Sequence, residues 1–435
     1  MSGPRSLDKP RPMWYNKTAD HTFHGISANL TRKETRDIDK LKRILKLTFI
    51  LTALLALFIT VSVVSLYFYE NRRPPYIKLS AGEIEKYVDS LKKNGLSPGD
   101  YILKKFDTNE VVIIGEPHRI RQHYEFLTSL VEPLARSGVA NIGLEFYDAS
   151  IQPSIDAFLS KETLDVALLR KIVLSDETGF FYQQLYDFFM KARDVRKMGL
   201  ALNILALEPA GGASSSKKDL NMAKIAENVV KKGGKILIYC GAHHAFTSYS
   251  QPFFIQFKRP DSITRAGQYI KSKFRRRVFF VNIHYPLSKK YWFAVPLFLY
   301  QKGFCLPFSG IPDQVFAKYK KPVGFDCDID LFRDIYDDFS YYSIGYGQLK
   351  MPELSDGCVY LNPLSEDKFV TPLENICKDP AEIEYIKTRT KSRLHKYYAS
   401  HEAAKALLEN DGLTPEAILE ELDIRGLEDV FSPSR

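Results

Sequence analysis

The sequence predicts an α/β fold with a mostly parallel sheet and helices on both of its faces. Short apolar runs rich in β-branched residues alternate with longer segments of helical periodicity. The runs are almost continuously apolar, which is typical of strands that are buried on both faces. One transmembrane helix should precede this domain, and a helical region should follow it. The expected domains are 1–46 (basic tail), 47–69 (transmembrane helix), 70–104 (linker and helix), 105–378 (α/β domain) and 379–435 (helical region).

The alternation also places the individual elements. Segments between the apolar runs carry apolar residues at helical spacing. Near the C-terminus, Thr414-Pro415 is typical of a helix start. Strands are expected at 111–115, 141–145, 202–208, 235–241 and 277–283, and helices at 81–93, 123–136, 182–198, 219–232 and from 381 onward.

An uncharged segment, Leu47 to Tyr69, precedes the domain. A helix of this length spans roughly 35 Å, which is enough to cross a bilayer. A buried core helix is the alternative, but such helices seldom run this far without a charge. A signal peptide fits worse, because 46 residues come before the segment. The sequence therefore predicts a bilayer-anchored protein.

The basic residues predict the orientation of this anchor. Seven Lys and Arg lie between 32 and 46, against four between 72 and 86. The N-terminus should therefore be cytosolic and the C-terminal domain extracytoplasmic, in the periplasm if the protein is bacterial. Residues 1–46 carry +6 of the net charge of +9, so the excess is mostly a topology signal and no nucleic-acid partner is expected. The basic run 271–277 is interpreted as a solvated face or a lipid-headgroup contact.

Five cysteines are too few for a disulfide scaffold in a domain of this length. Cys240 lies inside an apolar run and is expected to be a buried thiol. The others could pair in three ways in an oxidising compartment, and the sequence does not choose among them. These are Cys305, Cys327, Cys358 and Cys377.

Each predicted strand ends in an ionisable residue or is closely followed by one. The carboxyl ends of parallel strands meet at one edge of a sheet, where ligands bind, so these residues should converge. Two Gly-x-x-His patterns, Gly115 to His118 and Gly241 to His244, directly follow strands. The residues are Glu116 and His118 after the first strand, Glu145, Glu208, then His243 and His244, and finally His284.

Histidine supplies a near-neutral base or a metal ligand, and a nearby carboxylate can fix its tautomer or relay protons. Taken singly, Glu208 is also compatible with a solvated strand end, and His243 or His244 with a core histidine. The remaining histidines are assigned to structural positions or to the far side of the membrane. They are His21, His24, His123, His395 and His401.

The motifs GEPH and LEFYD, with NMAKIAENVV leading into KILIYCGAHHAF, resemble one superfamily. It joins ChaN-like haem-binding lipoproteins, erythromycin-esterase-like hydrolases and Tiki-type metalloproteases. PVGFD at 322–326 and DGCVYLNPL at 356–364 fit the same pattern. The resemblance covers residues 105–365 or so.

The three branches imply different chemistry. The Tiki-type branch implies metal-dependent hydrolysis, with His118, His244 and Glu145 as ligands of zinc, manganese or cobalt. The esterase-like branch implies that Glu116 and His118 activate water without a metal, although this chain lacks the Thr that precedes the first histidine there. The ChaN-like branch implies haem binding, but its haem-ligating tyrosine has no matching position here.

The leading functional hypothesis is a membrane-anchored hydrolase of an ester or amide, with a small-molecule, lipid-like or peptide substrate. His118, or a metal that it shares with His244, would activate water, and Glu116 and Glu145 would position it. Arg121 or His243 would stabilise the oxyanion. The alternative is a protein that binds haem or another apolar ligand in the same crevice, lined by the aromatic stretch 336–346. A scaffold with an inactive site is a third hypothesis.

Overall fold

The computed structural model describes most of the chain between residues 18 and 370. Two compact units are present, Met1–Asn71 and Arg72–Arg435. Cys377 and the helices predicted from residue 381 onward lie outside the described residues. The described residues are 18–70, 76–118, 120–175, 183–211, 215–249, 252–253, 261–262, 264–288, 304–343, 346, 348–368 and 370.

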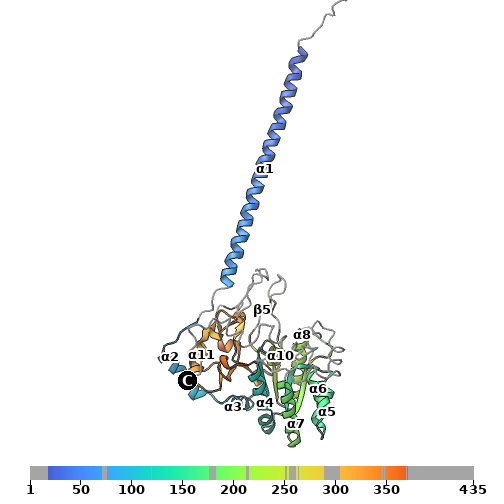
Figure 1. The fold of residues 1–435 in the computed structure, drawn as a ribbon, viewed down its shortest axis with the longest axis vertical. Helices are drawn as coiled ribbons and strands as arrows, with labels where there is room; N and C mark the ends of the chain where they lie inside the picture. Colours follow the sequence, from blue (N-terminus) through green and yellow to red (C-terminus); the bar gives the residue numbers. More distant parts are fainter. Residues whose placement is uncertain are drawn as a thin grey trace, which may run out of the picture. The chain divides into compact units, whose positions relative to one another are not determined.

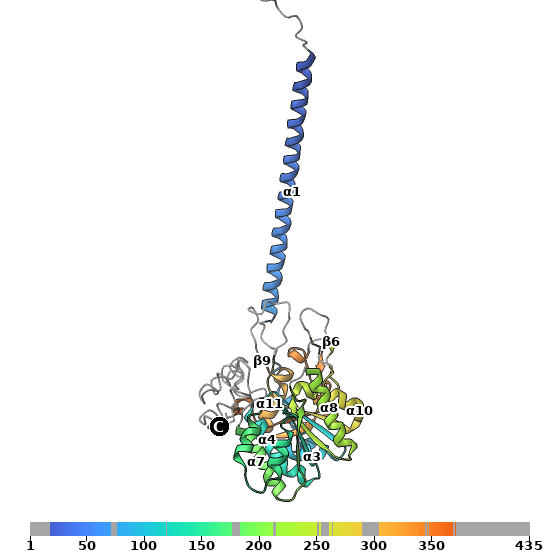
Figure 2. The ribbon, with the colours of Figure 1, turned by 90° about the vertical axis from the view of Figure 1, so that its right-hand side faces the viewer.

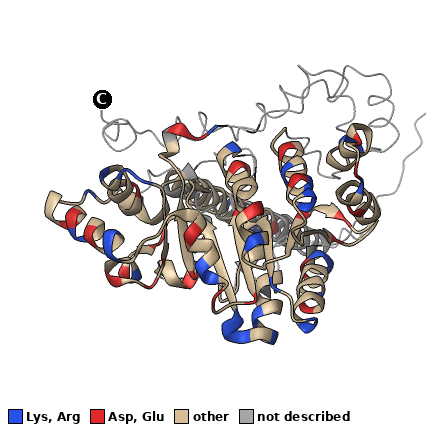
Figure 3. Cartoon of the chain, turned by 90° about the horizontal axis from the view of Figure 1, so that it is seen from below, with Lys and Arg blue, Asp and Glu red and all other residues tan. Residues whose placement is uncertain are grey.

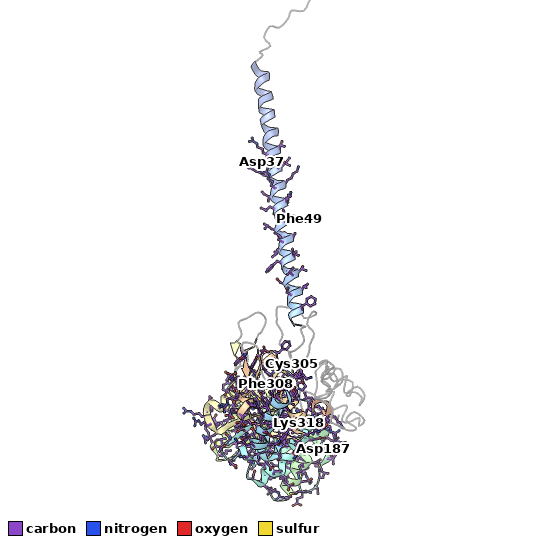
Figure 4. All side chains as sticks on the ribbon, turned by 90° about the vertical axis from the view of Figure 1, so that its left-hand side faces the viewer. Asp37, Phe49, Asp187, Cys305, Phe308 and Lys318 are labelled. Carbon is purple, nitrogen blue, oxygen red and sulfur yellow. The ribbon has the colours of Figure 1, made fainter. Side chains whose placement is uncertain are left out.

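The first unit is described as one helix, α1 (Thr18–Glu70) (Figure 1). Its segment Thr35–Ser65 is long and apolar enough to cross a membrane, with a mean hydropathy of 2.6 and no part of it buried. The side chains of α1 project outward around its axis, and Phe49 is 75% exposed (Figure 4). This segment overlaps the predicted span 47–69 and continues into the basic residues before it.

The second unit contains a seven-stranded sheet in the order β10-β13-β7-β1-β4-β2-β3. All neighbouring strands are parallel except β10 and β13, which are antiparallel. The five predicted strands are confirmed, and β10 and β13 extend the sheet beyond them. The strands are β1 (Val111–Glu116), β2 (Asn141–Asp148), β3 (Asn203–Glu208), β4 (Ile236–Gly241), β7 (Val278–Ile283), β10 (Val323–Asp326) and β13 (Gly357–Tyr360).

Helices cover both faces of the sheet. Alternate strand residues point to opposite sides, and the residues on both sides are apolar. In β1, Val112 and Ile114 enter one core, whereas Val111 and Ile113 enter the other. The helices α4 and α7 lie on one side of the strands, and α8 and α10 on the other (Figure 2). The longer helices are α2 (Ala81–Asn94), α3 (Pro98–Lys105), α4 (Arg121–Arg136), α5 (Gln152–Ser160), α6 (Val166–Val173), α7 (Gln183–Lys197), α8 (Ser215–Lys231), α10 (Ala266–Phe274) and α11 (Ile311–Tyr319).

Charged residues of both signs are mixed over the helices, as Figure 3 shows. Shorter elements connect the layers. The described cysteines, Cys240, Cys305, Cys327 and Cys358, are buried, and no disulfide joins any two of them. The short elements are α9 (Ala242–Ala245), α12 (Met351–Leu354), β5 (Pro252–Phe253), β6 (Asp261–Ser262), β8 (Leu287–Ser288), β9 (Phe304–Cys305), β11 (Tyr336–Asp337) and β12 (Leu349–Lys350).

Candidate active site

Glu116 and His118 form a pair at the carboxyl end of β1. The Glu116 side chain is fully buried, and its Oε2 accepts the backbone N–H of His118 at 2.5 Å. Its Oε1 contacts Nδ1 of the same histidine. The φ of 64° at His118 lies in the left-handed region, which non-glycine residues seldom adopt. This turn lets one carboxylate hold both the backbone and the ring, so the orientation of the imidazole is fixed.

The other side of the His118 ring faces Gly241, the last residue of β4. A Cβ at position 241 would lie 2.8 Å from His118 Nε2 and 3.4 Å from Glu145 Oε2. Glycine is therefore required there, since any side chain would collide with the ring. The His118 side chain is 28% exposed, so solvent reaches part of the ring. Nε2 of this ring and Oε2 of Glu145 both approach position 241, which brings a ring nitrogen and a carboxylate together.

A second set of ionisable side chains, in contact one after another, connects β2 to α8. Glu145 Oε1 lies 3.1 Å from Nε2 of His244, and Glu145 Oε2 accepts the N–H of Gly241 at 2.5 Å. On the other side of the ring, His244 Nδ1 lies 2.7 Å from Asp219 Oδ1. Both nitrogens of His244 therefore face carboxylates. The two Gly-x-x-His motifs meet at this edge of the sheet, as the sequence predicts.

Asp219 is itself fixed by residues that begin α10. Its Oδ1 also accepts the N–H of Ala266 at 2.8 Å, and its Oδ2 lies 3.6 Å from Nη1 of Arg265. Asp219 is completely buried and Arg265 nearly so. These contacts fix the position of the Asp219 carboxylate, so this aspartate can anchor the His244 ring.

The electrostatics of the two histidines differ from those of free imidazole. Burial opposes protonation of His118, but the Glu116 carboxylate outweighs it and raises the pKa to about 9. Burial is likewise outweighed at His244, where Glu145 and Asp219 raise the pKa to about 10. For Glu145, burial raises the pKa, but the charge and hydrogen bond of His244 hold it well below its usual range. At neutral pH both rings are therefore mostly protonated, and Glu145 is ionised.

The other predicted site residues have different partners. Glu208 is buried at the end of β3 and forms an ion pair with Lys218 of α8. Arg121 lies on the surface of α4, where its Nε is 2.7 Å from Oε1 of Glu125. Their roles in the site stay predictions.

Two further histidines, His243 and His284, follow the carboxyl ends of β4 and β7. His243 is exposed beside His244, and its ring packs edge-on against Tyr342 at 5.6 Å between centroids. His284 is buried, and its Nε2 lies 2.8 Å from Oδ1 of Asp313 in α11. His243 thus lies at the surface next to His244, whereas His284 belongs to a separate buried pair.

Asp219 and Arg265 were not among the predicted site residues. A signal for Asp219 exists in the sequence, since it precedes the buried Met222, Ala223 and Ala226 at helical spacing. A carboxylate on the apolar stripe of a helix requires a buried partner. Arg265 carries no comparable local signal, because it lies in the segment before a helix.

The predicted metal ligands His118, His244 and Glu145 do come together. His118 Nε2 and Glu145 Oε2 lie near one point beside Gly241, but both nitrogens of His244 face carboxylates, so the three residues do not direct one donor atom each to a common point. Within the described part of the chain, no group of three or more His, Cys, Asp and Glu side chains is arranged to hold a metal ion. The geometry fits paired acids and bases better than a cation, and metal ligation stays a prediction.

Tyr342, in the aromatic stretch that was expected to line a haem pocket, packs as core, whereas Tyr336 of the same stretch is exposed. Tyr342 is buried, and its hydroxyl lies 3.1 Å from that of Tyr285. Tyr249 donates its hydroxyl proton to the backbone oxygen of Tyr342 at 2.5 Å. These tyrosines contact one another, so their arrangement does not fit an open surface that binds haem. A visible absorbance band on addition of haem would revive that hypothesis.

No protein-family model matches the chain, and no curated protein does. Among solved structures, a mutant of the erythromycin esterase EreC in its open conformation is 12% identical, with 66% of this chain and 97% of that chain covered and a TM-score of 0.40. ChaN of Campylobacter jejuni, with cofacial haem, is 16% identical, with coverage of 45% and 89% and a TM-score of 0.30. The type III effector HopBA1 is 15% identical, with coverage of 43% and 82% and a TM-score of 0.30.

The similar structures thus include an erythromycin esterase and a ChaN haem-binding protein, two of the three groups that the motifs resemble. At this level of similarity they carry no argument about the chemistry of this chain. The functional proposal therefore depends on the site itself.

Proposed function

We propose that this chain is a membrane-anchored hydrolase that cleaves an ester or amide, with His118 as its general base. The observation that carries the proposal is the Glu116–His118 pair, whose ring faces Gly241 next to the Glu145–His244 pair. A partly exposed histidine that is held at one nitrogen by a buried carboxylate, with a second carboxylate near its other nitrogen, is suited to activate a hydroxyl or water nucleophile.

The reaction follows from these positions. In its neutral form, His118 accepts a proton at Nε2 from water while the water oxygen attacks the carbonyl carbon. The imidazolium then donates this proton to the leaving oxygen or nitrogen as the carbon–heteroatom bond breaks. Acid and alcohol, or acid and amine, are the products, and the histidine returns to its starting state. Glu116 stabilises the intermediate imidazolium through Nδ1.

Glu145 and its partners serve as positioning residues. The ionised Glu145 lies beside the same point as His118 Nε2, so it can accept the second hydrogen of the attacking water. His244 and Asp219 hold Glu145 in this place. Of the two residues expected to stabilise the oxyanion, His243 is the better candidate, because Arg121 is bonded to Glu125.

The test uses the purified full chain in neutral detergent with a panel of nitrophenyl esters and anilides. His118→Gln should lower kcat/KM by about a hundredfold or more, since general base catalysis contributes at least that much. Glu125→Gln, a surface change on the neighbouring helix, should leave it unchanged. Equal turnover of the His118→Gln variant and the parent protein would disprove the proposal. Treatment with a chelator should not alter turnover, and a loss that zinc restores would make His118 a metal ligand instead.

A further inference from the structure

The basic run 271–277 is not used by the proposed hydrolase. It comprises the end of α10 and a 3-10 turn, Arg275–Arg277, that leads into β7. These residues lie at the amino-terminal end of β7, whereas the candidate active site lies at the carboxyl ends of the parallel strands. Any ligand that they bind would therefore occupy the opposite edge of the sheet.

Three of the five cations in this run are paired with carboxylates. Lys273 contacts Glu227, Arg277 Nη1 lies 2.7 Å from Oε1 of Glu110, and Lys271 Nζ lies 3.4 Å from Oδ1 of Asp356. Arg275 and Arg276 are different, since neither forms an ion pair with a carboxylate in the part of the chain that the structure describes. Two adjacent guanidinium groups are thus left to interact with something else.

Both unpaired arginines line a hollow of about 490 Å³. Its apolar wall is formed by Val278 and Phe279. Asp356 also lines it, but one carboxylate oxygen accepts the N–H of Phe280 at 2.8 Å, and the other faces Lys271. The aspartate charge is therefore already compensated, and the arginines set the sign of the potential in the hollow.

The backbone at Arg275 adds an independent observation. Its φ is 51° and its ψ is −112°, a conformation that side-chain-bearing residues seldom adopt. Glycine would be the unstrained choice at this helix end. Strained backbone at a residue with a side chain is typical of functional contacts.

We propose that Arg275 and Arg276 form a phosphate-binding site at the amino-terminal edge of the sheet. Guanidinium groups bind phosphate oxygens through paired, charge-assisted hydrogen bonds. The phosphate belongs to a free organic phosphate or to a lipid headgroup, and the apolar wall accommodates the adjoining carbon chain. The site is separate from the hydrolase site, so either can fail without the other.

The test measures binding to the full chain in neutral detergent by calorimetry. The probes are inorganic phosphate, dioctanoyl phosphatidic acid and, as a zwitterionic control, dioctanoyl phosphatidylcholine. The Arg275→Gln/Arg276→Gln variant should bind phosphate probes roughly tenfold more weakly for each guanidinium lost. Arg196→Gln/Lys197→Gln removes the same charge from the exposed end of α7 and should bind normally.

Arg275→Gly provides a second variant, because it removes the guanidinium and relieves the backbone. It should melt no lower than the parent protein and still bind phosphate more weakly. Binding of both phosphate probes would support a site for free phosphates, and binding of phosphatidic acid alone a headgroup site. The proposal is overturned if the parent protein binds neither probe, or if the arginine variants bind them as well as the parent does.

Discussion

Gly241 is a residue whose missing side chain leaves room for the His118 ring. A methyl group there would lie 2.8 Å from His118 Nε2, so Gly241→Ala must displace the imidazole. A displacement of about 1 Å can lower a rate by about a hundredfold, and we expect a loss of kcat/KM of that order. Gly82→Ala is the matched control, because a Cβ at that helical position meets nothing within 4 Å.

The comparison of these two variants separates catalysis from folding. Circular dichroism should show that both keep the native helix content. If Gly241→Ala hydrolysed the model ester as fast as Gly82→Ala, the ring of His118 would not act where the structure places it.

His123 predicts how stability depends on pH. It is buried on α4, its Nδ1 has no hydrogen-bond partner within the described residues, and burial lowers its pKa to about 3. The unfolded chain takes up the proton near pH 6.5, so stability is complete above that pH and is lost as pH falls from about 6.5 toward 3. The contribution changes by about 1.4 kcal/mol per pH unit in this window.

His123→Phe should remove this dependence, because the phenyl ring fills the same space without a titrating group. Denaturant unfolding at several pH values measures the effect. The free energy of unfolding of the variant should fall less steeply below pH 6.5 than that of the parent protein. Parallel curves would show that His123 is not buried in its neutral form.

At the scale of elements, Tyr101 joins α3 to β10 and β13 at one side of the sheet. Its hydroxyl donates to Asp326 Oδ1 at 2.7 Å, and its ring covers Gly324 of β10 and Gly357 of β13. A Cβ at Gly324 would lie 2.5 Å from the ring. The glycines of the PVGFD and DGCVY motifs therefore have a packing role in this fold.

Gly324→Ala should accordingly destabilise the second unit without changing the active site. Overpacking of this kind costs about 1–3 kcal/mol. Gly99→Ala, on α3 but with open space around the added methyl, is the control. Denaturant midpoints and kcat/KM together give the readout. A loss of activity at full stability would contradict the packing role.

Part of this topology was predictable from the sequence. The strands β1 and β4 were predictable because their sequences, VVIIGE and ILIYCG, are almost continuously apolar. This pattern fits their burial on both faces of the sheet. The convergence of His118 and His244 followed from their positions after parallel strands. The strands β10 and β13 were not predicted, since four residues that include a glycine give little periodic signal. The pairing of Glu208 with Lys218 depends on how α8 packs, which no local pattern encodes.

At the scale of the whole molecule, the chain combines an apolar helix with an α/β unit. Segment Thr35–Ser65 can cross a membrane by length and composition, and the excess of basic residues before it predicts a cytosolic N-terminus. Protease digestion in sealed vesicles tests that orientation. An anchored catalytic unit would meet substrates at a membrane, which is why a lipid-like ester is a fitting first substrate to assay.

In the proposed hydrolase, His118, oriented by Glu116, is the general base. The most direct measurement is kcat/KM for a model ester as a function of pH, in the parent protein and in Glu116→Gln. The parent rate should rise with pH and level off near 9, where His118 loses its proton. Without the carboxylate the inflection should move toward about 6.5, the value of free imidazole, and the maximum should fall. A parent rate that is flat up to pH 9, or an inflection that stays in place in Glu116→Gln, would contradict the account.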